Sequence, residues 1–246
     1  MSINNGTEYI LQCFKDNGII IDPAQAEAFH KYYEFLIEKN KVMNLTGITD
    51  FEEVVTKHFI DCCLNVDLPS PTASLIDIGT GAGFPGVPLK ILYPGLKVTL
   101  LDSLNKRINF LNELITLLGL TDIEAIHMRA EDAAFEKKYR EHFDVAVSRA
   151  VANLSTLCEY CLPFVKPHGV FISFKGDLQN ELSDAGFAIN RLGGDSKNVS
   201  VKTFSIPGVA DNRSLIYIPK EKNTPREFPR KAGIPAKSPL SLLQEK

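Results

Sequence analysis

The stretch DIGTGAGFPGVPL, residues 77–89, decides the fold of this chain. It follows the apolar run SLIDI at 74–78 and leads into a helical pattern, so it forms the turn between a strand and a helix. Glycine at positions 79, 81 and 83 lets the backbone turn sharply and approach a ligand closely. Such a loop is typical of α/β sheets that bind nucleotides or nucleosides.

Downstream of this loop, short apolar runs alternate with helical patterns, which predicts a parallel sheet covered by helices on both faces. The last two strands have no helix between them and are expected to pair as a hairpin. The architecture is therefore α/β, with a doubly wound, mostly parallel, seven-stranded sheet. The predicted strands are 74–78, 97–102, 123–128, 144–148, 169–175, 199–206 and 213–219, and the helices lie near 86–93, 104–118, 131–141, 154–162 and 177–189.

Upstream of the sheet, the sequence predicts three helices. The first ends at Gly18, the second begins at Asp22-Pro23 and runs to about Asn40, and the third begins near Asp50. We therefore divide the chain into three parts: an N-terminal helical cap (1–70), a sheet domain (71–220) and a basic, proline-rich C-terminal tail (221–246).

The composition is that of a globular protein, since 44% of the 246 residues are hydrophobic and 23% are charged. No apolar run approaches the roughly 18 residues of a membrane span, and the first residues lack the pattern of a signal peptide. The odd number of cysteines, five, favours free thiols in a reducing compartment over a disulfide framework. We expect a cytoplasmic monomer without membrane contacts.

The charge is unevenly distributed along the chain. Residues 1–70 hold five basic and eleven acidic side chains, whereas residues 219–246 hold seven basic and three acidic ones. A basic C-terminus is either a solvated tail or a contact for a polyanion. Its cations are interleaved with Phe228 and several prolines, a mixture that can hold them in an extended arrangement against phosphates.

The glycine loop allows two ligand registers besides a purely structural turn. Gly81, Gly83 and Gly86 satisfy the dinucleotide fingerprint formally, but Asp77 would then place a carboxylate near a pyrophosphate. The alternative register, Asp77-x-Gly79-x-Gly81-x-Gly83, is the first motif of S-adenosylmethionine-dependent methyltransferases. That ligand is cationic at its sulfonium and ammonium groups, so a nearby carboxylate favours it.

Two later segments support a nucleoside ligand. Asp102 ends the second strand, about where an acidic side chain accepts hydrogen bonds from ribose hydroxyls, although it could also cap the following helix. Residues 129–132, Arg-Ala-Glu-Asp, follow the third strand, where a loop that contacts adenine would lie.

The residues after the fourth strand face the methyl acceptor and read Ser148-Arg149-Ala150. They contain neither an Asn-Pro-Pro-Tyr-like tetrad for an exocyclic amine nor a Pro-Cys pair for attack on a pyrimidine. Arg149 is the distinctive group, because a guanidinium can bind phosphate or pair with guanine O6 and N7. The single Cys158-x-x-Cys161 pair lacks a second ligand pair, so we expect buried thiols and no metal.

Together these motifs closely resemble the RsmG/GidB family, the bacterial 16S ribosomal RNA guanine-N7 methyltransferases. The resemblance covers nearly the whole chain and implies a Rossmann-like class I methyltransferase fold. Its motifs are Asn44-Leu45-Thr46, His58–Asp61, DIGTGAGFPGVPL (77–89), LLDSLNKR (100–107), MRAED (128–132), VSRAVANL (147–154), Lys175-Gly176 and FPRKAGIPAKSPL (228–240).

The resemblance implies roles for individual residues. S-adenosylmethionine would contact Gly79, Phe84, Asp102, Ser103, Leu104, Ala130, Glu131 and Arg149, with Arg149 also serving catalysis where donor and acceptor meet. Lys175, Arg230, Lys231 and Lys237 would face the RNA, which is 16S rRNA or a precursor of the small ribosomal subunit. Three alternatives stay open: a methyltransferase for another substrate, a non-catalytic sensor of the donor, and a nicotinamide-dependent oxidoreductase.

Overall fold

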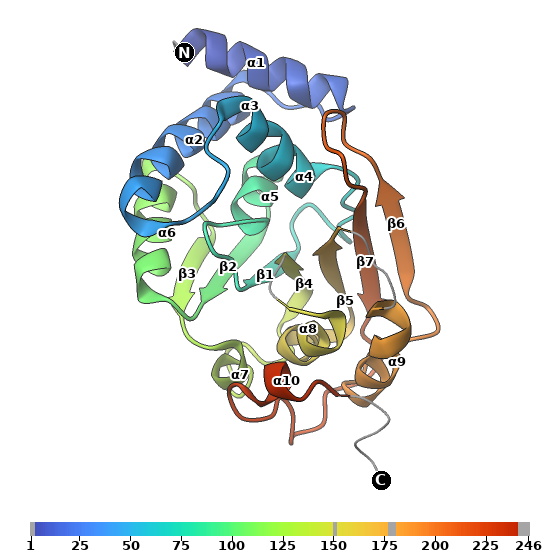
Figure 1. Ribbon diagram of the computed structural model, residues 1–246. Coiled ribbons are helices and arrows are strands. Elements are labelled where there is room, and N and C mark those ends of the chain that lie inside the picture. Colours follow the sequence, from blue (N-terminus) through green and yellow to red (C-terminus); the bar gives the residue numbers. More distant parts are fainter. Residues whose placement is uncertain (1–2, 150–151, 177–180, 241–246) are drawn as a thin grey trace.

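The computed structural model describes residues 3–149, 152–176 and 181–240. Its centre is a seven-stranded sheet with the order β3-β2-β1-β4-β5-β7-β6 (Figure 1). The first five strands are parallel, and β7 runs antiparallel to both β5 and β6. The predicted parallel sheet and the terminal hairpin are therefore confirmed. The strands are β1 Ser74–Ile78, β2 Lys97–Asp102, β3 Ile123–His127, β4 Phe143–Arg149, β5 Val165–Lys175, β6 Ser200–Phe204 and β7 Arg213–Pro219.

The helices follow the predicted positions with three differences: α7, the third N-terminal helix, and α10, a short helix where only a tail is predicted. The segment predicted as a helix over 131–141 contains only one helical turn, α7. The residues after α7 form successive turns, and the Arg140 side chain among them donates to backbone carbonyls of other segments. The start of the helix predicted over 177–189 lies outside the described residues. The helices are α1 Ile3–Asp16, α2 Pro23–Met43, α3 Phe51–Val54, α4 Asp61–Cys63, α5 Gly86–Leu92, α6 Asn105–Leu118, α7 Ala130–Ala133, α8 Leu154–Cys161, α9 Glu181–Arg191 and α10 Ile234–Lys237.

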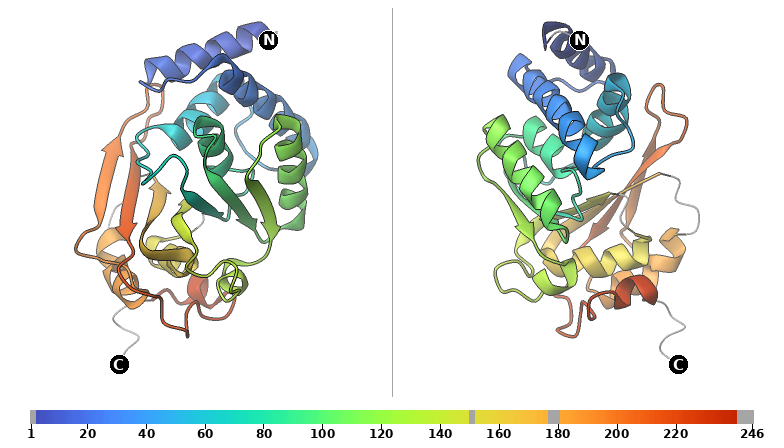
Figure 2. Two further views of the ribbon diagram at one scale, coloured as in Figure 1. Left: turned by 180° about the vertical axis from the view of Figure 1, so that it is seen from behind. Right: turned by 60° about the vertical axis from the view of Figure 1, so that its left-hand side comes forward.

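Alternation along the strands divides the core into two layers. On β4, Val145 and Val147 face one layer and Ala146 faces the other. On β1, Leu75 faces the first of these layers and Ile76 the second. This follows from the two-residue period of a strand. Helices cover both faces of the sheet (Figure 2), with α1, α2, α5 and α6 in one layer and α8 and α9 in the other.

The N-terminal helices share their core with the sheet. Phe29 and Tyr32 on α2 and Phe59 are completely buried in the same cluster as Leu111 of α6 and Val87 of α5. The region predicted as a cap over 1–70 thus packs continuously against the sheet domain. The third predicted helix is interrupted by a π-helical segment, Val55–Ile60, between α3 and α4.

The described part of the C-terminal region, residues 221–240, folds back onto the second layer. Phe228 and Leu240 are buried in the core formed by α8 and α9, and α10 packs against α8. In Figure 1 this segment runs beneath α8 and passes close to α7. It is therefore a packed element of the fold over this range.

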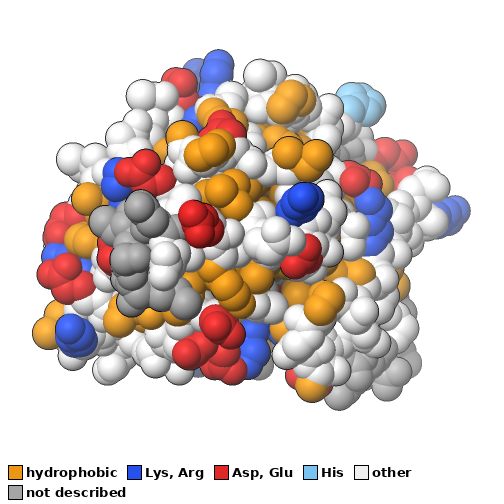
Figure 3. Space-filling view, turned by 90° about the horizontal axis from the view of Figure 1, so that it is seen from above, with side chains coloured by type: hydrophobic (Ala, Val, Ile, Leu, Met, Phe, Trp, Pro, Cys, Tyr) orange, Lys and Arg blue, Asp and Glu red, His pale blue; other side chains and the backbone are white. Residues whose placement is uncertain are grey.

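The opposite end of the molecule carries α1. Figure 3 shows Lys, Arg, Asp and Glu side chains interspersed with apolar ones on that face. Within the described residues, no helix combines the length and the apolar character that crossing a membrane requires.

Candidate functional site

A cavity of about 890 Å³ opens at the carboxyl ends of the parallel strands. Ligands of doubly wound sheets bind at this edge, because the loops that follow the strands converge there. Eight of the residues predicted for the site line the cavity, whereas Leu104, Arg230, Lys231 and Lys237 do not. The eight are Gly79, Phe84, Asp102, Ser103, Ala130, Glu131, Arg149 and Lys175.

Asp77 holds the glycine loop in shape and does not line the cavity. Its Oδ2 accepts hydrogen bonds from the Gly86 amide at 2.8 Å and from the Thr80 hydroxyl at 2.7 Å. The side chain is completely buried, and this burial raises the pKa of Asp77 to about 7. The carboxyl group is thus enclosed behind the loop, where it braces the backbone from inside and does not reach the cavity surface.

The loop also depends on the N-terminal helices. Gly79, Gly81 and Gly83 all have positive φ, which strains other residues. A Cβ on Gly83 would lie 2.8 Å from the Tyr32 hydroxyl, and that hydroxyl donates to the Ala82 carbonyl at 2.5 Å. Helix α2 thus fixes the loop from the side, a contribution that the sequence pattern does not reveal.

Hydrogen bonds to both carboxylate oxygens hold the Asp102 side chain in place. Oδ1 accepts from the Leu104 amide at 2.9 Å, and Oδ2 accepts from the Gly81 amide at 3.0 Å and from Arg107 at 3.1 Å. Leu104, not Asp102, is the N-cap residue of α6. The side chain thus connects the end of β2 to the glycine loop and presents a fixed acceptor at the edge of the cavity, as a ribose diol requires.

Glu131 occupies the other end of the cavity, in the single turn of α7. It is buried, and its Oε1 accepts a hydrogen bond of 2.9 Å from the Gly233 amide. Gly233 and Ala236 of the C-terminal region also line the cavity. The sequence predicts a tail at these two positions, and no local pattern indicates that they reach the wall of this cavity.

Arg149 is held by an ion pair with an aspartate from the N-terminal helices. Its Nη1 lies 2.9 Å from Asp61 Oδ2, and Arg213 Nε lies 2.9 Å from the other oxygen of Asp61. The guanidinium lies over the Phe84 ring, with Cζ 4.9 Å from the ring centroid. Two cations therefore share one carboxylate, so this cluster of three side chains carries a net positive charge at its end of the cavity.

His58 completes this end of the cavity. Its ring centroid lies 4.6 Å from that of Phe84, and its Nε2 lies 2.9 Å from the Thr46 hydroxyl oxygen. Burial, followed by the positive charge of Arg149, lowers the pKa of His58 to about 4. The imidazole is consequently neutral near pH 7 and adds no further charge beside Arg149 and Arg213.

Sequence reasoning did not assign roles to Tyr32, His58, Asp61 or Arg213. A partial signal was present, because the His58–Asp61 segment is one of the motifs of the resemblance. The π-helical segment is a second signal, since π-helical turns occur frequently at functional sites. It carries Lys57 and His58 to the cavity and ends next to Asp61.

The four cations predicted to face RNA lie in three different environments: the cavity, an ion pair with a buried carboxylate, and the surface. Lys175 lines the cavity, where its ammonium group contacts the Ala152 carbonyl at 2.6 Å and Glu181 at 2.8 Å. Arg230 forms an ion pair of 2.6 Å with the fully buried Glu159. Lys231 and Lys237 are exposed on the surface of the C-terminal region.

The cysteines occupy buried helical positions with one exception. Cys62, Cys63, Cys158 and Cys161 are buried, Cys13 is half-buried, and all five are free thiols. Over residues 3–149, 152–176 and 181–240, no group of three His, Cys, Asp or Glu side chains is arranged to hold a metal ion.

Comparisons with known proteins agree with this geometry. The GidB family, described as rRNA small subunit methyltransferase G, matches residues 25–205. Ribosomal RNA small subunit methyltransferase G of Desulforamulus reducens is 51% identical over 97% of this chain and 100% of that protein. The protein of the same name from Lachnoclostridium phytofermentans is 50% identical, over 94% of this chain and 96% of that protein.

Among solved structures, a methyltransferase from Pyrococcus furiosus superposes with a TM-score of 0.51 at 15% identity. The match covers 78% of this chain and 98% of that one. A protein of Agrobacterium tumefaciens described as a predicted O-methyltransferase also gives a TM-score of 0.51, at 16% identity over 65% of this chain and 78% of that one. The predicted class I methyltransferase fold is thereby confirmed. By the extent of the sequence matches, this chain belongs to the family of rRNA small subunit methyltransferase G.

Proposed function

We propose that this protein transfers the methyl group of S-adenosylmethionine to N7 of a guanosine in 16S rRNA, near the decoding centre. One observation carries the proposal. In a chain of this family, a single cavity has Asp102 and the glycine loop in its wall, as a nucleoside ligand requires, and also contains the arginine Arg149. The RNA would be mature 16S rRNA or a precursor of the small ribosomal subunit.

The residues of the cavity fit a donor of this shape. Asp102 would accept hydrogen bonds from the ribose hydroxyls, the 79–84 loop would hold the methionine part, and Ala130 and Glu131 would contact the adenine. S-adenosylmethionine supplies a methyl group on a positively charged sulfur, and the transfer leaves S-adenosylhomocysteine. Because Asp77 is enclosed, the loop backbone would make the direct contacts.

The acceptor end needs no general base. The N7 lone pair of guanine is unprotonated at neutral pH, so it can attack the methyl carbon directly once it is aligned. Catalysis then consists of in-line positioning and exclusion of water. Arg149, fixed by Asp61 and by the Phe84 ring, would position the base at the point where donor and acceptor meet.

Mapping of methylated nucleosides in 16S rRNA tests the proposal. We expect a strain that lacks this protein to lose one N7-methylguanosine, and the purified protein with S-adenosylmethionine to restore it. A donor sensor or an enzyme for another substrate would leave the rRNA modification intact. Calorimetry with both cofactors decides the remaining alternative, because tight NAD binding without binding of the methyl donor would overturn the proposal.

The exposed lysines of the C-terminal region are proposed to bind RNA phosphates. In Lys231→Ala/Lys237→Ala, we expect affinity for a 16S rRNA fragment to fall about tenfold. We also expect the slope of log K against log salt to become shallower by about 1.5, because two phosphate contacts are lost. Filter binding over a salt series measures both quantities. Lys41→Ala, which changes an exposed lysine of α2, is the matched control, and an equal effect there would contradict the assignment.

A further inference from the structure

The C-terminal residues 224–240, named here the strap, lie between the surface and the donor end of the cavity. Gly233 and Ala236 of the strap line the cavity, while Lys231 and Lys237 are exposed on its outer side. The strap therefore belongs to the wall of the donor site. Two sets of polar contacts, most of them partly buried, hold it in place.

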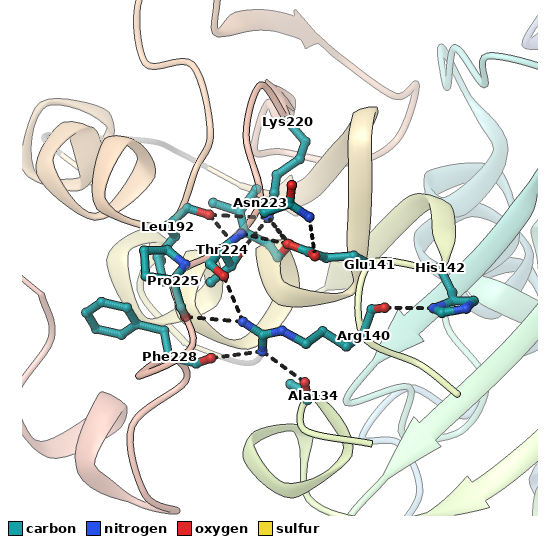
Figure 4. Close-up of polar contacts among 11 residues, drawn as sticks. Ala134, Arg140, Glu141, His142, Leu192, Lys220, Asn223, Thr224, Pro225 and Phe228 are labelled. Atoms are coloured by element: carbon teal, nitrogen blue, oxygen red, sulfur yellow. Dashed lines mark hydrogen bonds and ion pairs between the residues drawn. The ribbon is translucent and has the colours of Figure 1, made fainter. Parts of the chain in front are cut away.

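The first set anchors the beginning of the strap and is drawn in Figure 4. One guanidinium, Arg140, donates to the carbonyls of Thr224 at 2.8 Å, Pro225 at 3.1 Å and Phe228 at 2.9 Å. It also donates to the Ala134 carbonyl at 3.0 Å, just after α7. The same side chain thus ties the strap to the turn that contains Glu131.

The neighbouring residue strengthens this anchor. Glu141 accepts hydrogen bonds from the Thr224 amide at 2.6 Å and from the Asn223 side chain. Lys220, which is almost completely buried, contacts the Thr224 hydroxyl oxygen and donates to the Leu192 carbonyl at 3.2 Å. The start of the strap is consequently fixed to the sheet domain from two sides.

The second anchor is the ion pair between Arg230 and Glu159 of α8. Arg230 donates from its backbone amide at 2.7 Å and from Nη2 at 2.6 Å to the two oxygens of Glu159. Its Nη2 also donates to the Ser238 carbonyl at 2.8 Å, across the short helix α10. Glu159 is completely buried, so loss of the guanidinium would leave an uncompensated charge in the core.

Between these anchors and α10, the strap reaches the donor site. Gly233 has a φ of 82°, and its amide donates to Glu131 Oε1 at 2.9 Å. Over the described residues, no hydrogen bond occupies the other oxygen, Oε2. A carboxylate only accepts hydrogen bonds, and the donor group on adenine is its exocyclic amine. The strap thus holds one oxygen of Glu131 and leaves the second for the base.

We propose that Arg230 and Glu159 are positioning residues for the methyl donor: they hold the strap so that Gly233 orients Glu131 toward the adenine amine. The inference rests on the proposed function, since it takes S-adenosylmethionine as the ligand of this cavity. It gives Arg230 a role in donor binding in place of the direct RNA contact that its position in a basic segment suggested. Specificity for adenine then depends on residues about 100 positions apart in the chain.

The experiment compares two ligands that differ only at the base, S-adenosylhomocysteine and S-inosylhomocysteine, by calorimetry on the full chain. Hypoxanthine carries a carbonyl oxygen where adenine carries the amine, so it lacks the amine donor proposed for Glu131, and its remaining donor on that edge is N1–H. In Arg230→Gln, we expect the Kd for the adenosine ligand to rise about tenfold, the size of one lost charge-assisted hydrogen bond. The Kd for the inosine ligand should stay within about twofold of that of the unaltered protein, so the preference for the adenosine ligand over the inosine ligand falls.

A general loosening of the fold would weaken binding of both ligands alike and leave the ratio of their two Kd values unchanged. That outcome would overturn the proposal. Arg230→Lys keeps the charge but loses the forked geometry, so it provides a milder variant if Arg230→Gln is unstable. Arg226→Gln, an exposed cation of the same strap, is the matched control and should bind both ligands as the unaltered protein does. If the unaltered protein binds neither ligand, the proposed function itself fails.

Steady-state methylation gives an independent measurement. Arg230→Gln should raise the KM for S-adenosylmethionine about tenfold while kcat and the KM for RNA stay close to those of the unaltered protein. A raised KM for RNA with an unchanged donor KM would assign Arg230 to the RNA surface and contradict the positioning role.

Discussion

Arg149→Ala is expected to lower the turnover of rRNA methylation by about 100-fold or more, because it removes a preorganised group from the place where donor and acceptor are proposed to meet. The guanidinium is fixed by Asp61 at 2.9 Å and lies over the Phe84 ring, so a water molecule that replaces it cannot position a base equally well. Single-turnover methylation at saturating donor measures the loss directly.

The fold should survive this substitution. Asp61 keeps its contact with Arg213 at 2.9 Å, so the carboxylate is not left without a cation. Thermal unfolding of Arg149→Ala is therefore expected to stay close to that of the unaltered protein. Arg149→Lys retains the charge without the planar fork and should recover only part of the rate. Unaltered rates in Arg149→Ala would show that Arg149 does not take part in the reaction.

The second large effect is expected for Gly79→Val, which should weaken binding of S-adenosylhomocysteine about 100-fold or more. Gly79 lines the cavity and has a φ of 71°, a conformation that a β-branched residue adopts only under strain. The valine would shift the loop and bring a side chain to the wall that is expected to contact the methionine part. Calorimetric titration measures the change in Kd.

Gly119→Val separates strain from loss of the site. Gly119 has a φ of 61° at the C-terminus of α6, with no atom within 4 Å of an added Cβ, and it does not line the cavity. Gly119→Val should lower the free energy of unfolding by about 1–2 kcal/mol, as strain at Gly79→Val does, but should bind S-adenosylhomocysteine normally. Equal losses of binding in both variants would show that the effect of Gly79→Val is global.

Part of the site could be predicted from the sequence because it lies on contiguous segments next to strand ends. The glycine loop and Glu131 follow strands of the parallel sheet and Asp102 ends one, and such positions converge at one edge whatever the details of packing. For Asp77 the motif gives the position, but only packing shows that its carboxyl bonds to the loop from inside and does not line the cavity.

The helix predicted over 131–141 illustrates a second limit. Its charged, alanine-containing sequence has no intrinsic barrier to helix formation, yet only Ala130–Ala133 is helical. Arg140 gains four hydrogen bonds to carbonyls, three of them in residues more than 80 positions away. Contacts of that kind outweigh local preference, and no window of the sequence contains them.

The sequence alone determined the sheet, its parallel core and the loop that marks the ligand edge, because strand periodicity and glycine spacing are local properties. Tertiary structure alone decided which distant side chains complete the site: Tyr32 behind the glycine loop, Asp61 between two arginines, and Gly233 against Glu131. The physical reason is that these contacts join segments 50 to 152 residues apart. Hydrogen bonds and ion pairs over such separations exist only after the layers have packed.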